Sequence, residues 1–155
     1  MWINIVDMNA AFDVDVRLTL YRDFIQTGRA PSAQRIAQIV QAPLDHVRAA
    51  LERLAAGKVI VLQPESREIL MANPLSAVPT PFLVWANDRS FFGSCVWDAL
   101  GIIAMLQTDG TLETSCSCCG EAMTITIRNG QLLPIQGVIH FAIPAKRWWE
   151  HIVFT

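Results

Sequence analysis

The chain has 155 residues, of which 52% are hydrophobic and 17% are charged, with a formal net charge of −2. This composition excludes a largely disordered chain, because disorder goes with low hydrophobicity and high charge. The small net charge gives no bulk electrostatic reason to bind nucleic acid. The longest apolar run, residues 99–106, is far shorter than the roughly 20 residues that span a membrane. Residues 1–16 are acidic without basic side chains, so we expect no secretory signal and a cytoplasmic location.

The first part of the chain shows helical patterns followed by a hairpin pattern. The spacing of apolar residues predicts three helices, at residues 15–27, 32–40 and 43–57. Ser32 is the expected N-cap of the second helix, and Gly57 is expected to end the third. Residues 59–62 and 68–71 flank a polar turn and predict a β-hairpin. This order indicates a winged-helix-like lobe over residues 1–72.

A linker and a second lobe are predicted to follow. Three prolines within residues 73–81 remove backbone donors and predict a linker there. Strands are predicted at residues 82–85, 111–114, 123–128 and 132–143, and helices at residues 94–107 and 145–152. The helix at 94–107 is apolar on nearly all sides, so we expect it to be buried, and Asn129-Gly130 predicts a tight hairpin. The predicted fold is α+β: the three-helix lobe, then a small mixed or antiparallel sheet with a buried helix over residues 82–155.

Cys95 and Asp98 are the first candidate reactive groups. They lie three residues apart at the start of the predicted helix, so both side chains project from one face. A helix N-terminus lowers the pKa of a thiol, and the thiolate is the reactive form. Asp98 could hold or deliver a proton beside it. The alternative is a buried structural cysteine next to an aspartate that suits the helix dipole, which is the commoner case for such spacing.

A cysteine cluster, Cys116, Cys118 and Cys119, is the second candidate. The spacing of Cys116 and Cys119 suits half of a tetrahedral zinc site, but no second such pair follows, and His140 and His151 are isolated. Zinc at these two cysteines therefore remains an alternative, beside a tight turn with partly buried thiols. Thiolates this close together attract soft metals in either case.

The third predicted helix is a candidate for DNA recognition. It would present His46, Arg48 and Arg53, but Asp45 and Glu52 offset their charge. Phosphate binding needs clustered basic side chains, so nucleic acid is not expected as a partner.

Given these residues, the chain resembles the organomercurial (alkylmercury) lyase family. The similarity is strongest over residues 92–101, Phe-Gly-Ser-Cys-Val-Trp-Asp-Ala-Leu-Gly, which match the family's catalytic Cys-x-x-Asp helix, and it continues at residues 114–120 and 148–155. The family's second catalytic cysteine would fall immediately after Thr155. We therefore expect the domain at residues 82–155 to lack its C-terminal strand, which would leave a sheet edge able to form a homo-oligomer.

The resemblance implies protonolysis of a carbon–mercury bond. Cys95 would be the first thiolate and the mercury ligand, Asp98 the proton shuttle, and Trp97 a candidate wall of the pocket for the organic group. Mercury(II) is soft, so thiolates outcompete oxygen and nitrogen donors for it, and apolar surroundings would raise the pKa of Asp98. The implied partners are an organomercurial substrate and cellular thiols, with mercury(II) as product and no required cofactor.

Two other functions fit the same residues. One is a non-catalytic winged-helix protein that binds or senses mercury or another thiophilic metal through the cysteine cluster. The other is a structural protein stabilised by zinc.

Overall fold

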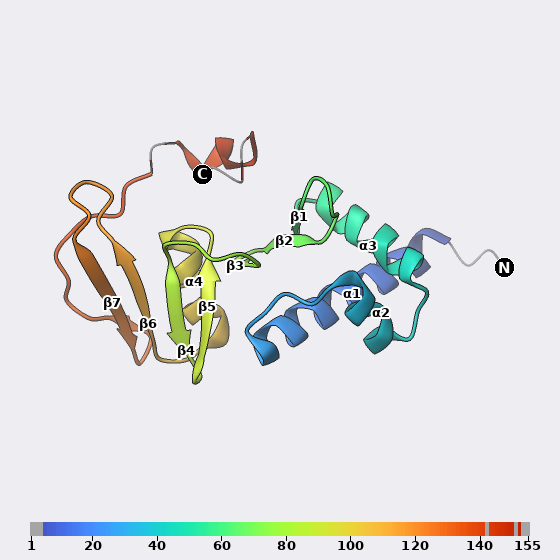
Figure 1. Ribbon diagram of the computed structural model, residues 1–155, viewed down its shortest axis with the longest axis horizontal. Coiled ribbons are helices and arrows are strands. Elements are labelled where there is room, and N and C mark those ends of the chain that lie inside the picture. The colour runs from blue at the N-terminus through green and yellow to red at the C-terminus, as the bar shows by residue number, and fades with distance from the viewer. Residues whose placement is uncertain (1–4, 142, 151, 153–155) are drawn as a thin grey trace. The chain divides into compact units, whose positions relative to one another are not determined.

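The computed structural model describes residues 5–141, 143–150 and 152. The chain divides into two compact units, Met1–Val78 and Pro79–Thr155, and the boundary falls within the predicted linker. Figure 1 shows that the first unit is mainly helical and that the second holds the longer strands. Among the helices that the structure describes, none has the length and apolar character needed to cross a membrane.

The helices of the first unit are α1 (Ile5–Thr27), α2 (Ala33–Val40) and α3 (Leu44–Ala56). Ser32 is the N-cap of α2, as predicted, and its Oγ accepts a hydrogen bond from the Arg35 N–H at 3.2 Å. Gly57 is the C-cap of α3, also as predicted. The helix α1 begins well before the predicted residue 15. Residues 9–11 are helical but exposed, so no apolar stripe in the sequence indicates that they belong to the helix.

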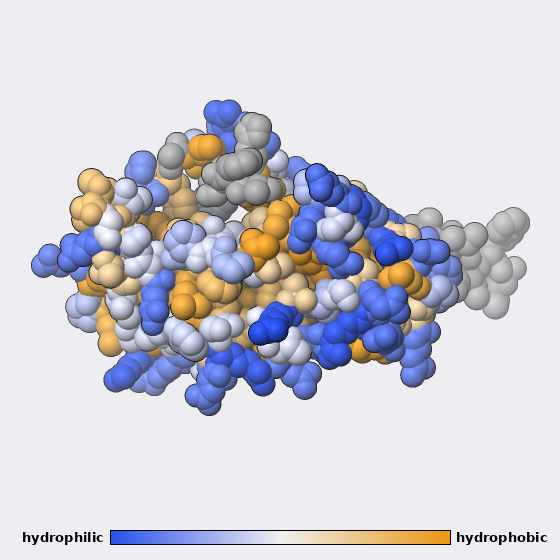
Figure 2. Space-filling model, viewed as in Figure 1, coloured by the Kyte–Doolittle hydropathy of each residue, from blue (hydrophilic) through white to orange (hydrophobic). Residues whose placement is uncertain are grey.

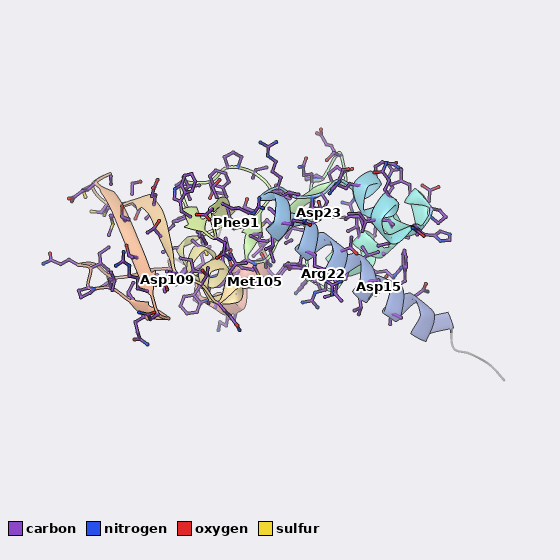
Figure 3. The ribbon with its side chains drawn as sticks, turned by 90° about the horizontal axis from the view of Figure 1, so that it is seen from below. Asp15, Arg22, Asp23, Phe91, Met105 and Asp109 are labelled. Atoms are coloured by element: carbon purple, nitrogen blue, oxygen red, sulfur yellow. The ribbon has the colours of Figure 1, made fainter. Side chains whose placement is uncertain are left out.

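The three helices enclose the core of the first unit. Its fully buried side chains include Val16, Leu20, Phe24, Ile36, Val47 and Leu51. The carboxylate of Asp23, labelled on α1 in Figure 3, is 6% exposed and accepts hydrogen bonds of 2.6–2.9 Å from the Arg35 guanidinium. This ion pair joins α1 to α2 and satisfies a buried charge that would otherwise be costly.

Three short strands complete the first unit: β1 (Val61–Leu62), β2 (Ile69–Ala72) and β3 (Leu75–Ser76). β1 and β2 form the predicted antiparallel hairpin, and β2 also pairs with β3. The expectation that the prolines of residues 73–81 exclude regular structure is wrong for β3. Leu75 and Ser76 are buried, and Pro74 and Pro79 lie outside the strand rather than within it.

The second unit is an antiparallel sheet with one α-helix. Its elements are β4 (Leu83–Ala86), β5 (Arg89–Gly93), α4 (Val96–Leu106), β6 (Gly110–Ser115), β7 (Ala122–Arg128), β8 (Gln131–Leu132) and the 3₁₀ helix η1 (Ala145–Glu150). The strand order is β5-β4-β6-β7-β8, and each adjacent pair is antiparallel. The α+β class and the antiparallel sheet are therefore confirmed. β5 was not predicted; Asn87 and Asp88, both with positive φ, form the turn that precedes it.

The helix α4 contacts β4, β5 and β6 and is seen beside β4 and β5 in Figure 1. Ala99, Ile102 and Ile103 are buried, whereas Trp97 is 59% and Met105 is 37% exposed. Figure 3 labels Met105 on this helix. The expectation of a wholly buried helix is wrong, because the sheet covers only one of its faces.

The predicted strand at residues 132–143 is also wrong. Only Gln131 and Leu132 form β8, and residues 133–140 are irregular and exposed. Pro134 lacks the N–H that a continuing ladder needs, which ends the pairing. Figure 2 shows hydrophobic residues interspersed with hydrophilic ones on the visible face, and the exposed large hydrophobic side chains include Leu133, Ile135 and Val138.

The elements that flank this irregular segment agree better with the sequence-based prediction. Asn129 and Gly130 have φ of 50° and 70°, the backbone of the tight β7–β8 hairpin that their sequence predicted. The helical pattern at residues 145–152 appears as η1, and His151 lies outside the described residues.

We expect Leu112→Ala to reduce the free energy of unfolding by about 2–5 kcal/mol, because it removes a fully buried side chain from β6 and leaves a cavity. Leu132→Ala in β8, where the side chain is 54% exposed, should change it by no more than about 0.5 kcal/mol. Urea unfolding of both variants measures the difference. Equal effects would contradict the placement of β6 at the centre of the sheet.

Candidate functional site

A close backbone approach sets the point at which α4 begins. The N–H of Gly93, the last residue of β5, donates to the Phe82 carbonyl at 3.0 Å. The hydroxyl of Thr80 donates to the Gly93 carbonyl at 2.6 Å. A Cβ on Gly93 would lie 2.5 Å from the backbone nitrogen of Ala99. Only glycine therefore allows the end of β5 to lie this close to the first turn of α4.

Cys95 is the N-cap of α4. Its backbone is extended, with φ −146° and ψ 178°, and its sulfur accepts a hydrogen bond from the Asp98 N–H at 3.5 Å. The Ala99 N–H donates to the Cys95 carbonyl at 2.9 Å, the first bond of the helix. The thiol thus occupies a position that Ser, Thr, Asp or Asn usually fills, at the positive end of the helix dipole.

The structure brings the two predicted site residues together. The side chains of Cys95 and Asp98 lie near enough to interact, and each shifts the pKa of the other. Both residues are half-buried. The three-residue spacing therefore corresponds to a sulfur that contacts the backbone of Asp98 on the first turn of α4.

Burial dominates the protonation of this pair. It raises the pKa of the Asp98 carboxyl, an effect that the Cys95 thiol opposes. Burial also raises the pKa of the Cys95 thiol, and the neighbouring Asp98 carboxylate raises it further. The backbone N–H groups of Asp98 and Trp97 lower this pKa, but by less. The expectation that the helix N-terminus lowers the thiol pKa is therefore wrong, since desolvation outweighs the backbone donors. Both groups therefore keep their protons to a higher pH than the same side chains in water.

Three residues near the pair were not singled out from the sequence. Gly93 and Thr80 position the start of α4. The hydroxyl of Ser94, which precedes Cys95, is buried and has no hydrogen-bond partner among the described residues. An unmade hydrogen bond of this kind is costly. The Phe-Gly-Ser run before Cys95 was the only sequence signal for two of these residues.

The cysteine cluster lies elsewhere, in the turn between β6 and β7. The Cys116 N–H donates to the Glu121 carbonyl, and the Gly120 N–H donates to the Cys116 carbonyl, both at 2.8 Å. The nearby backbone N–H groups of Cys119 and Cys118 lower the pKa of the Cys116 thiol. The turn therefore stabilises a thiolate, with Cys118 and Cys119 exposed beside it.

The surroundings of this turn bear on the zinc alternative. Within the part of the chain that the structure describes, no three His, Cys, Asp or Glu side chains are grouped so as to hold a metal ion. His140 is exposed on the irregular segment. A tetrahedral zinc site needs four ligands, and the described residues do not assemble them here.

The helix considered for DNA recognition, α3, carries paired charges. Arg53 forms an ion pair with Asp13 at 2.7 Å, and Arg48 lies 3.8 Å from Asp45. His46 is exposed on the same helix. Acidic partners reduce the positive potential that phosphate groups would meet.

Comparisons with known proteins indicate the family of the chain. The model of a family described as alkylmercury lyase (MerB) matches residues 75–155, just over half of the chain. The solved structure of the mercury-bound form of MerB2 is similar in fold, with a TM-score of 0.62 and 24% identity over 77% of this chain. This chain spans 59% of the length of that protein. No curated protein matches the chain.

The pH dependence of alkylation should distinguish the cysteines. Because the pKa of Cys95 is raised and that of Cys116 is lowered, Cys95 should react with iodoacetamide at a higher midpoint pH than Cys116. Asp98→Asn should lower the midpoint of Cys95, because it removes a negative charge beside the thiolate. Asp88→Asn, in the β4–β5 turn, should leave the midpoint unchanged. Peptide mass spectrometry reads each site, and a Cys95 midpoint below that of Cys116 would contradict the burial argument.

Gly93→Ala should destabilise the protein by about 1–3 kcal/mol, because the added methyl group overlaps the backbone of Ala99. It should also change the alkylation profile of Cys95, since the first turn of α4 must shift. Gly57→Ala is the matched control: its Cβ would come no nearer than 3.4 Å to another residue. Urea unfolding and alkylation test both variants, and an unaltered Gly93→Ala protein would rule out the positioning role.

Proposed function

The chain belongs to the alkylmercury lyase family, and we propose that it cleaves the carbon–mercury bond of organomercurials by protonolysis. Cys95 binds the mercury as a thiolate, and Asp98 carries the proton. The observation that supports this proposal most is the hydrogen bond of 3.5 Å from the Asp98 N–H to the Cys95 sulfur, which joins the two residues on the first turn of α4. This proximity supports the proposal, because one substrate could then meet both a soft metal ligand and a proton carrier.

The first step is exchange of thiolates on mercury. An organomercurial arrives bound to a cellular thiol, and the Cys95 sulfur forms a bond to mercury as the carrier thiolate leaves. The proton of the Cys95 thiol passes to the Asp98 carboxylate and from there to the departing thiolate. The raised pKa of Cys95 does not prevent this exchange, because the strength of the sulfur–mercury bond compensates for loss of the proton.

The second step breaks the bond between carbon and mercury. A second thiolate, which a cellular thiol can supply, adds to mercury and increases the electron density on the metal. The proton of that thiol passes through Asp98 to the carbon, which leaves as a hydrocarbon, while mercury(II) keeps two sulfur ligands. Because burial raises the pKa of Asp98, its carboxyl group can hold a proton closer to neutral pH and act as a general acid.

Trp97 is the residue best placed to contact the organic group. It lies between Cys95 and Asp98 in sequence, in the first turn of α4, and is 59% exposed. An exposed indole ring offers a large apolar surface to an alkyl or aryl group. We therefore infer that this side chain contacts the organic group of the substrate.

Release of benzene from phenylmercury in the presence of excess thiol tests the proposed reaction. We expect Cys95→Ser and Asp98→Asn each to reduce the rate by at least about 100-fold, the usual contribution of a general acid or more. Cys118→Ser, which alters an exposed cysteine of the β6–β7 turn, should retain the unaltered rate. Gas chromatography of the headspace measures the product.

Mass spectrometry of the same samples separates binding from cleavage. Asp98→Asn should retain phenylmercury on Cys95 without releasing benzene, because the thiol is intact and the proton carrier is not. If the unaltered protein binds phenylmercury and releases no benzene, the non-catalytic alternative is correct.

A further inference from the structure

The β6–β7 turn holds three cysteines that the proposed reaction does not use. Cys116 follows β6 directly, and the bond from the Gly120 N–H to the Cys116 carbonyl closes the turn at 2.8 Å. The Cys116 N–H donates to the Glu121 carbonyl at 2.8 Å, so Cys118 and Cys119 lie within this tight turn beside Cys116. The closed turn therefore keeps Cys116 and Cys119 close together, at the three-residue spacing of a dithiol pair.

This turn is open to solvent. Cys118 and Cys119 are exposed and Cys116 is partly buried. Gly120 has a φ of 74°, and nothing lies within 4 Å of the position that its Cβ would occupy. A metal carried by a small thiol can therefore reach both sulfurs without rearrangement of the sheet.

We propose that Cys116 and Cys119 form a second, dithiol site that binds mercury(II) between two sulfurs, separately from Cys95. Among the described residues no third ligand is grouped with the pair. Zinc prefers four ligands in such sites, whereas a soft d¹⁰ cation such as mercury(II) is satisfied by two thiolates. The site goes beyond the proposed lyase activity and does not depend on it.

Binding is an exchange that conserves protons and electrons. Mercury(II) arrives with two small thiolates; two sulfur–mercury bonds break, and two form with Cys116 and Cys119. The protons of the two cysteine thiols pass to the departing thiolates, and no atom is oxidised or reduced. The closed turn favours the exchange, because after the first sulfur binds, the second is held nearby at a high effective concentration.

Retention of mercury by a Cys95→Ser protein tests the site. The protein is incubated with mercury(II) and a large excess of glutathione and desalted, and the metal is counted by native mass spectrometry. We expect one mercury per chain. Cys95→Ser/Cys119→Ser should lose at least nine-tenths of it, and the matched control Cys95→Ser/Cys118→Ser should keep it. Circular dichroism verifies that the exposed substitutions leave the fold unchanged.

Each result either supports or overturns the site. Mercury retained by Cys95→Ser/Cys119→Ser, or lost from Cys95→Ser/Cys118→Ser, would overturn it. Zinc(II) alone should not be retained; one zinc per chain that depends on Cys119 would show further ligands and overturn two-coordinate binding. Since every protein in this experiment lacks the Cys95 thiol, its outcome is separate from that of benzene release.

Discussion

The contact between the backbones of Gly93 and Ala99 is the constraint on which the candidate site depends. It places the end of β5 against the first turn of α4, so that the chain must enter the helix through an extended residue. That residue is Cys95, whose sulfur caps the helix by accepting the N–H of Asp98. Capping in turn holds the sulfur next to the Asp98 carboxylate. The pairing of thiol and acid is thus a consequence of backbone packing and does not require a separate set of contacts.

The two cysteine environments show how burial and backbone donors compete. Backbone N–H groups lie near both Cys95 and Cys116, yet the pKa of the first thiol is raised and that of the second is lowered. Cys95 is half-buried beside an acidic partner, so desolvation and charge outweigh its donors. Cys116 lies in a solvent-facing turn where the donors prevail. One side-chain type therefore has two chemical characters in a single unit of the fold.

The features that could be predicted from the sequence are those that depend on residues close together in the chain. The caps at Ser32 and Gly57 and the contact of Cys95 with Asp98 follow from short-range spacing, and all were predicted. The strand expected beyond Leu132 was not found, because Pro134 interrupts the ladder despite an apolar pattern. The one-sided burial of α4 and the sign of the thiol pKa depend on which strands cover the helix. Neighbours distant in sequence decide such properties, and a single sequence does not reveal them.

A thiol that keeps its proton also resists oxidation. Peroxides attack the thiolate, and the resulting sulfenic acid can proceed to irreversible products. Because burial and Asp98 favour the protonated form of Cys95, this sulfur is a slow target for such damage. The thiolate-favouring Cys116 in the exposed turn is a faster one. Under oxidative stress the turn would therefore lose its reduced sulfurs first, while the sulfur at the helix N-terminus stays reduced.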